Sequence, residues 1–231
     1  MTKKPVAILL SGCGVRDGSE ITEAVSLMIA LSEESLPFDS FAPNRKQEKV
    51  FDHYEKKDLS HNTRNILTES ARISRCSISP LGDLDVKNYS ALLIPGVFGA
   101  GSNLCDFYMN GKDSQLTSDV KKTLESFHNE KKVIGAMCIA PILLALLMRD
   151  NPTNKASLTF GREESNEVSI IKQWGISHIE KTVSDICFDK ENLFITSPAY
   201  MYDTATAFDI FKSAKTLVSK LASLLRGKNL E

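Results

Sequence analysis

The sequence predicts a doubly wound α/β fold with a mostly parallel sheet, formed as a single domain over residues 1–231. Short apolar runs such as residues 6–10 lack polar alternation, which is typical of parallel strands covered on both faces. These runs alternate with helix-length segments, and no long linker, repeat or low-complexity tract interrupts them. The hydrophobic content of 42% and the charged content of 25% are ordinary for a globular protein.

In the first half of the chain, apolar runs predict strands at residues 6–10, 38–42 and 89–94. The glycine-rich turn 11–18 leads into a helix that Ser19 can cap. The apolar residues of this helix fall on one face: Ile21, Val25, Met28 and Ile29.

Residues 44–61 are polar and charged and predict a surface excursion. Asn62 or Thr63 can cap the helix that follows, which runs to Arg72. Four residues of that helix are expected to face inward: Ile66, Leu67, Ser70 and Ile73.

In the second half, the glycine-containing loop 95–101 ends a strand, and a helix is expected at 117–130. Apolar residues 133–137 predict a buried strand that turns at Cys138 into an apolar helix, with Pro141 near its first turn. Next come a weak strand at 158–160 and a short helix at 167–174. A hairpin then joins 186–188 to 193–196, and an amphipathic helix closes the chain at 204–225.

Charge and cysteine content limit the partners and the compartment. A net charge of −1 gives no reason to expect nucleic acid or a membrane surface as a partner. The five cysteines are odd in number and contain no C-x-x-C pair, which indicates reduced thiols and a cytoplasmic location. The first residues lack the pattern of a secretory signal, and the apolar run 133–148 is shorter than the ~18–20 residues of a membrane span.

Three features should meet at one edge of the sheet. The turn 11–18, the loop 95–101 and Cys138 each follow a predicted strand, and parallel strands present their carboxyl ends at a common edge, where ligands bind. A cysteine between strand and helix lies against a helix N-terminus, whose partial positive charge favours the thiolate. We therefore interpret Cys138 as a nucleophile, the alternative being a buried structural cysteine.

The partner of such a nucleophile can be sought among nearby acids and histidines. Glu20 and Glu23 stand in the first turns of the first helix and could hydrogen-bond the sulfur, or could simply be acids favoured by the helix dipole. His178 and Glu180 offer a Cys–His–Glu arrangement, although alternation would turn His178 toward solvent. The glycine spacing of residues 12–18 is too loose for a dinucleotide-binding turn, and a tight turn is the simpler interpretation.

Several segments, in order and covering most of the chain, resemble the ElbB family. The residues that carry the resemblance lie in the segments 11–25, 41–43, 63–73, 137–141 and 196–201, including Met137-Cys138-Ile139-Ala140-Pro141 and Pro198-Ala199-Tyr200-Met201. ElbB proteins, historically labelled isoprenoid-biosynthesis proteins, are similar to the PfpI-like and class I glutamine amidotransferase-like superfamily. The resemblance implies a flavodoxin-like sandwich, a cysteine on a nucleophile elbow and a homodimer.

The resemblance also implies an activity and the residues for it. The activity is of glyoxalase type: a small aldehyde or dicarbonyl such as glyoxal becomes a hydroxy acid, with no cofactor, metal or glutathione. Cys138 would be the nucleophile and Glu23 its acid partner, with Glu20 the second choice.

The remaining site residues implied by the resemblance bind the substrate. Backbone N–H groups around Gly96, Val97 and Ile139 would contact the oxyanion, and Tyr200 would join the binding residues. Val97 stands where the family usually carries a second glycine. Ile139 stands where hydrolytic relatives carry the triad histidine, so protease or glutaminase chemistry is not expected.

The sequence therefore predicts a cofactor-independent enzyme in which the Cys138 thiolate adds to an aldehyde and Glu23 moves protons. One alternative is a non-enzymatic redox sensor or binding module built on Cys138. Another is a degenerate amidotransferase-like subunit linked to isoprenoid metabolism, which would need a histidine beside the cysteine.

Overall fold

A seven-stranded sheet forms the centre of the computed structural model, which describes residues 4–150 and 155–227. Its strands run in the order β10-β11-β7-β6-β1-β2-β5, and only β10 is antiparallel to its neighbour. Their bounds are β1 (Val6–Leu9), β2 (Phe38–Ala42), β5 (Ile78–Pro80), β6 (Ala91–Ile94), β7 (Val133–Met137), β10 (Cys187–Asp189) and β11 (Phe194–Ser197). Every residue of β1, β6 and β7 is buried, which explains their unbroken apolar sequences.

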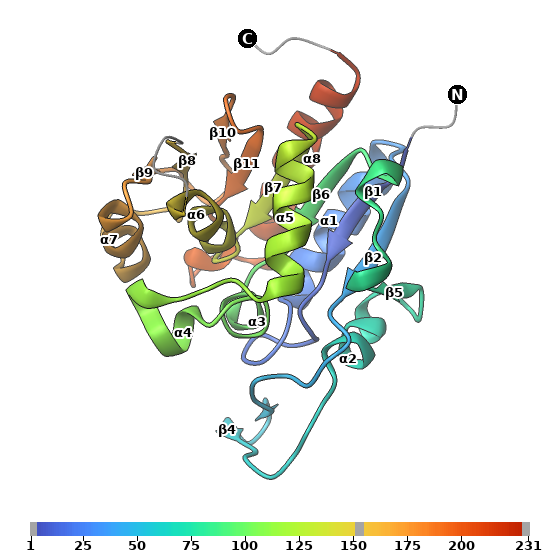
Figure 1. Cartoon of the computed structure of the whole chain (residues 1–231), viewed down its shortest axis with the longest axis vertical. Helices are drawn as coiled ribbons and strands as arrows, with labels where there is room; N and C mark the ends of the chain where they lie inside the picture. Colours follow the sequence, from blue (N-terminus) through green and yellow to red (C-terminus); the bar gives the residue numbers. More distant parts are fainter. Residues whose placement is uncertain (1–3, 151–154, 228–231) are drawn as a thin grey trace.

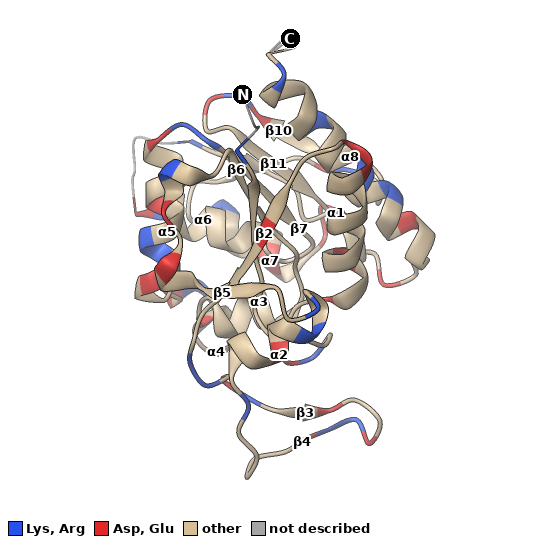
Figure 2. Cartoon of the chain, turned by 90° about the vertical axis from the view of Figure 1, so that its right-hand side faces the viewer, with Lys and Arg blue, Asp and Glu red and all other residues tan. Residues whose placement is uncertain are grey.

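Helices cover both faces of this sheet (Figures 1 and 2). On one face α1 (Ile21–Glu33) lies beside α8 (Ala207–Leu225), and on the other lie α5 (Ser118–Asn129) and α6 (Pro141–Arg149). The remaining helices and short strands are α2 (Ile66–Ile73), α3 (Phe98–Asn103), α4 (Phe107–Asn110), α7 (Asn166–Gln173), β8 (Ser157–Leu158), β9 (Ser177–His178) and the 3₁₀ turn η4 (Ala199–Met201). The doubly wound α/β prediction is confirmed.

The strand order reverses at β1. The chain leaves β1 toward β2 and β5, then returns to the other side of β1 with β6, β7 and β11. The loops after β1 and β6 and the turn after β7 therefore sit around the switch point, where open α/β sheets bind ligands. This arrangement confirms the predicted meeting of the two glycine turns with Cys138.

Several local predictions differ from the structure. The cap of α1 is Glu20, whose side chain accepts the N–H of Glu23, rather than Ser19. The cap of α2 is Asn65, whose side chain accepts the N–H of Thr68, rather than Asn62 or Thr63. Strand β5 was not predicted, because its few residues carry little apolar signal. The closing helix begins later than expected, at a capping box in which Thr206 and Asp209 satisfy each other's backbone N–H groups.

Three of the four residues predicted to form the apolar face of α1 are exposed to solvent. Ile21, Val25 and Ile29 are exposed at 47%, 37% and 50%. A second stripe, consisting of Ala24, Leu27, Ala30 and Leu31, packs into the core instead. The small alanines let the helix approach its neighbours closely, and the same inward face carries Glu23.

The excursion predicted at residues 44–61 contains a short antiparallel pair, β3 (Phe51–Asp52) with β4 (Lys57–Asp58). Figure 2 shows this pair projecting beyond the body of the molecule. No helix within residues 4–150 and 155–227 is both long and apolar enough to cross a bilayer.

Candidate active site

Cys138 occupies a sharp turn between β7 and α6. Its φ of +56° lies in the left-handed region, and its N–H donates to the carbonyl oxygen of Ser197 at 2.9 Å. Pro141 is the first residue of α6, where its missing N–H breaks no helical bond. The side chain is almost fully buried, so the elbow holds the thiol inside the protein at the switch point.

Glu23 is the acid that faces the thiol. Its side chain is fully buried on the inward face of α1, and its carboxyl group hydrogen-bonds the Cys138 sulfur. Gly96 donates its backbone N–H to Oε2 at 2.8 Å, and Tyr200 donates its own to Oε1 at 3.4 Å. Glu20 has a different role, because it caps α1 by accepting the N–H of Glu23 at 2.7 Å.

Burial dominates the electrostatics of this pair. It raises the pKa of Glu23 to about 8, against the lowering effect of the Gly96 N–H, and no cation is among the leading influences. Burial, followed by the charge of Glu23, also raises the pKa of Cys138 well above its ordinary value. The expectation of a thiolate stabilised by the helix N-terminus is therefore wrong, because desolvation outweighs the helix dipole here.

The two groups consequently titrate as a pair. At neutral pH both hold their protons, and the first proton leaves near pH 8, the value to which burial raises the Glu23 pKa. The resulting negative charge lies on the Glu23 carboxylate, because burial and that charge raise the pKa of Cys138 well above its ordinary value. Such a pair can release and take up a proton close to physiological pH.

The loop after β6 closes tightly over the elbow. A Cβ on Gly96 would lie 2.6 Å from the Cβ of Cys138, so only glycine allows this approach. Val97 has φ +87° and ψ 179°, a region that is otherwise almost confined to glycine. The N–H groups of Val97 and Ile139 both donate to the Cys138 sulfur. The N–H of Gly96 is occupied by Glu23, so its predicted oxyanion contact is not supported.

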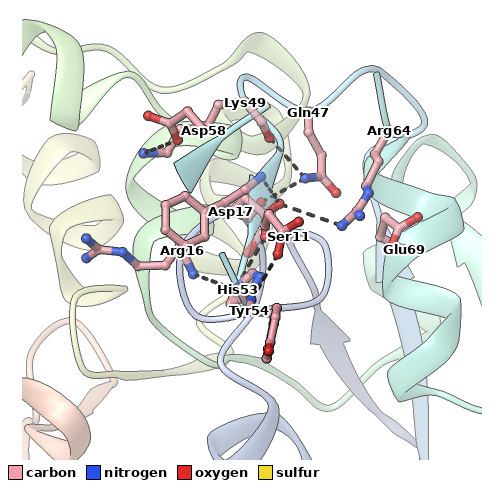
Figure 3. Close-up of polar contacts among 12 residues, drawn as sticks. Ser11, Arg16, Asp17, Gln47, Lys49, His53, Tyr54, Asp58, Arg64 and Glu69 are labelled. Atoms are coloured by element: carbon pink, nitrogen blue, oxygen red, sulfur yellow. Dashed lines mark hydrogen bonds and ion pairs between the residues drawn. The ribbon is translucent and has the colours of Figure 1, made fainter. Parts of the chain in front are cut away.

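A second buried carboxylate, Asp17, lies on the loop between β1 and α1 (Figure 3). Its Oδ2 accepts the N–H of Phe51 at 2.8 Å and lies 3.9 Å from the Arg64 guanidinium. His53 Nε2 is 3.9 Å from Oδ1. Asp17 thus ties the excursion to the glycine turn. No role was predicted for it, although an acid inside a glycine turn and the Thr63-Arg64-Asn65 segment were visible signals.

His178 does not complete a triad. Its side chain is buried rather than solvent-facing, and Nδ1 lies 3.0 Å from Glu163. Burial lowers the pKa of His178, with a further contribution from Lys172. Among the described residues, no histidine hydrogen-bonds Cys138, and no group of three or more His, Cys, Asp or Glu side chains is arranged to hold a metal ion.

Comparison with known proteins finds relatives whose names refer to a class 1 glutamine amidotransferase-like domain or to ES1. No family model matches the chain. A human protein named glutamine amidotransferase-like class 1 domain-containing protein 3, mitochondrial, is 37% identical over 227 residues, or 95% of this chain and 82% of the relative. The rat ES1 protein homolog, mitochondrial, is 37% identical over 86% of this chain and 76% of the relative.

A solved structure with an amidotransferase-like domain is also similar to this chain. The isoprenoid biosynthesis protein with amidotransferase-like domain from Ehrlichia chaffeensis superimposes with a TM-score of 0.86 and 31% identity, covering 95% of this chain and 99% of that one. Drosophila melanogaster DJ-1beta, at a TM-score of 0.54 and 18% identity, covers 98% and 92% and shares the fold. The chain therefore belongs to the ElbB family of ES1-like proteins, which carry a class I glutamine amidotransferase-like domain.

Proposed function

We propose that this protein is a cofactor-independent enzyme of glyoxalase type that converts small dicarbonyls into hydroxy acids, such as glyoxal into glycolate. The observation that carries the proposal is the buried pair of Cys138 and Glu23, a thiol hydrogen-bonded to an acid whose pKa is raised to about 8. A nucleophile beside a proton-transfer group that works near neutral pH is the minimum that this reaction needs.

The first step is addition. Glu23, as carboxylate, takes the thiol proton while the sulfur forms a bond to one aldehyde carbon of glyoxal, and the proton then passes to the carbonyl oxygen to give a hemithioacetal. The N–H groups of Val97 and Ile139, which donate to the sulfur in the free protein, stand beside the position where the oxyanion develops.

The second step moves hydrogen within the adduct. Glu23 removes the proton on the sulfur-bearing carbon to give an enediol and returns a proton to the neighbouring carbon, leaving a thioester. Water then breaks the carbon–sulfur bond, which releases glycolate and restores the thiol. Overall, one glyoxal and one water give one glycolic acid, with no external oxidant or reductant.

The test is glycolate formation from glyoxal by the Cys138→Ala variant. We expect turnover to fall by about 10³-fold or more, since removing a covalent nucleophile leaves only binding effects. Cys187→Ala removes another buried thiol, on β10, and should leave turnover unchanged. Equal turnover by the wild type and Cys138→Ala would refute the proposal.

The redox-sensor alternative has a separate readout. Oxidation favours low-pKa thiols, and burial raises the pKa of Cys138, so the structure favours the enzyme over the sensor. Selective sulfinic modification of Cys138 after mild peroxide, together with no dicarbonyl turnover, would reverse that preference.

All five cysteines are free thiols, which supports a reducing location such as the cytoplasm.

We further propose that the protein acts as a homodimer through the outer face of α1. Ile21, Val25 and Ile29 follow at four-residue intervals, so they form one exposed apolar stripe. Phe208, 66% exposed, stands at the start of the neighbouring α8. An apolar patch on a helix is best covered by a like patch, because a two-fold dimer pairs identical surfaces.

Sedimentation of the wild type and of Ile29→Glu tests the dimer. We expect a dimer at micromolar concentration that Ile29→Glu converts to a monomer, because each interface would bury two unpaired carboxylates. Met109→Glu changes a similarly exposed apolar residue on α4 and should remain dimeric. A monomeric wild type would contradict the proposal.

A further inference from the structure

Arg16 is an arginine whose guanidinium is held by aromatic rings. Its Cζ lies 4.8 Å from the centroid of Phe98 and 5.5 Å from that of Phe51. Its backbone N–H donates to His53 at 3.2 Å, which fixes the loop to the excursion. Figure 3 shows the side chain pointing away from the Asp17 carboxylate and from Arg64.

Five of the eight arginines pair with an acid, whereas Arg16, Arg75 and Arg162 form no ion pair among the described residues. Five form ion pairs: Arg45 with Asp119, Arg64 with Asp17, Arg72 with Glu69, Arg149 with Asp150 and Arg226 with Glu34. Within residues 4–150 and 155–227, no ion pair involves Arg16. A guanidinium stacked on aromatic faces keeps its N–H groups at the edge free to donate.

The same rings connect Arg16 to the active-site cysteine. Phe98 directly follows Val97, whose N–H donates to the Cys138 sulfur. Tyr108 on α4 stacks on Phe98 with ring centroids 4.8 Å apart. We call Arg16, Phe98 and Tyr108 the aromatic rim.

Electrostatics agree with this placement. Burial raises the pKa of Tyr108, the Cys138 charge raises it further, and Arg16 lowers it. Tyr108 therefore lies within electrostatic reach of both the sulfur and the guanidinium. The aromatic rim thus spans the distance from the nucleophile to an unpaired cation.

We propose that Arg16 binds the anionic group of the substrate, so that the Cys138 site prefers oxo compounds that carry a carboxylate or phosphate over neutral dicarbonyls. The reaction of the bound substrate rests on the proposed function, whereas the binding of an anion by Arg16 does not. A guanidinium binds either anion through two parallel N–H···O bonds, which would orient the carbonyl carbon toward the sulfur. The stacked rings of Phe98 and Tyr108 would lie beside the short carbon chain that joins the anionic group to the carbonyl carbon.

The experiment uses two alkylating reagents that differ in charge. The Cys138 sulfur displaces iodide from iodoacetate or iodoacetamide to form a thioether, and the thiol proton goes to solvent. Rates at Cys138 are followed by peptide mass spectrometry in the full-length protein, at a pH above the Glu23 pKa of about 8. The exposed Cys76 serves as the internal reference, since both reagents reach it from solvent.

We expect Arg16→Gln to lower the ratio of iodoacetate to iodoacetamide rates at Cys138 by about tenfold, the loss of one charge-assisted contact. Arg16→Lys should retain part of the ratio. Arg226→Gln removes an exposed arginine at the end of α8, and should leave the ratio at Cys138 unchanged. An equal change for both reagents, or no change, would overturn the assignment of Arg16.

Protection and turnover identify the anion. If Arg16 binds phosphate groups, inorganic phosphate should slow alkylation of the wild type but not of Arg16→Gln; if it binds carboxylates, acetate should do so instead. Protection by neither anion would count against the proposal. A protein that shows the Arg16-dependent ratio but no glyoxal turnover would refute the proposed reaction while leaving the anion site intact.

Discussion

Glu23 and Asp17 are two buried carboxylates on the same stretch of chain, and their surroundings give them different uses. Glu23 accepts two backbone N–H groups and faces a thiol, and burial raises its pKa to about 8. Asp17 accepts the N–H of Phe51 and has the guanidinium of Arg64 at 3.9 Å. The contrast teaches that a buried acid with no cation beside it keeps an exchangeable proton, whereas a buried acid beside a guanidinium holds two segments of the chain together.

The difference also separates the two regions around them. Around Glu23 the backbone is forced into unusual conformations, with positive φ at Cys138, Val97 and Ala199. Around Asp17 the polar contacts are ordinary ones that fasten a loop: Gln47 and Asn103 both donate to the Asp17 carbonyl oxygen. Strain collects where geometry is imposed on the reacting group.

The largest expected effect concerns catalysis. Glu23→Gln keeps the size of the side chain but cannot exchange a proton, so we expect dicarbonyl turnover to fall by about 10²–10⁴-fold. Asp17→Asn, the matched change in the other carboxylate, should leave turnover of the folded protein nearly intact. Comparable losses in both variants, measured as glycolate formation, would remove the distinction between the two acids.

Stability should depend more strongly on Asp17 than on Glu23, the reverse of the order expected for turnover. Asp17→Ala leaves the Phe51 N–H and Arg64 without their partner, and we expect a loss of about 2–4 kcal/mol in the free energy of unfolding by urea. Most of this comes from the half-buried Phe51 N–H, because Arg64 is partly solvent-exposed. Protease cleavage should also appear within the excursion. A loss below about 1 kcal/mol would mean that Asp17 does not anchor this segment.

The pH dependence of stability distinguishes the acids again. Between the ordinary pKa of 4.5 and the raised value of about 8, unfolded Glu23 releases a proton that folded Glu23 retains. Stability supplied by this group is therefore full below pH 4.5 and is lost as pH rises through 8, by up to about 1.4 kcal/mol per pH unit. Glu23→Gln should flatten that decline in urea titrations. Parallel curves for wild type and variant would contradict the raised pKa.

The smallest expected effect tests the strain. Val97 and Val133 are equally buried, but only Val97 has a positive φ. Replacing either by glycine loses similar packing, and at Val97 it also relieves about 1–3 kcal/mol of backbone strain. We expect Val97→Gly to cost less than Val133→Gly by about that amount in thermal unfolding. Equal costs would show that the backbone at Val97 stores no strain.

Periodicity and turn chemistry were enough to predict most of the fold. The buried strands and the Cys138–Pro141 junction followed from apolar runs and proline placement, because these are local signals. The orientation of α1 could not be predicted, since the helix carries two apolar stripes and only packing against α8 decides between them.

The residues of the site were predicted from the sequence, but their protonation states were not. Cys138 and Glu23 could be singled out from their positions, and the choice of Glu23 over Glu20 came from the family resemblance. Their raised pKa values depend on complete burial, which no local pattern reports. The Asp17–Arg64 contact joins residues 47 positions apart in the chain, so pairing them required the three-dimensional structure.

The central claim is that Glu23 carries an exchangeable proton beside Cys138. The direct measurement is a carbon NMR titration of protein labelled at the glutamate carboxyl carbons, with the Glu23 signal assigned by its absence in Glu23→Gln. We predict an apparent pKa near 8 for this signal in the wild type. A Glu23 signal that titrates near the ordinary 4.5 would contradict the account.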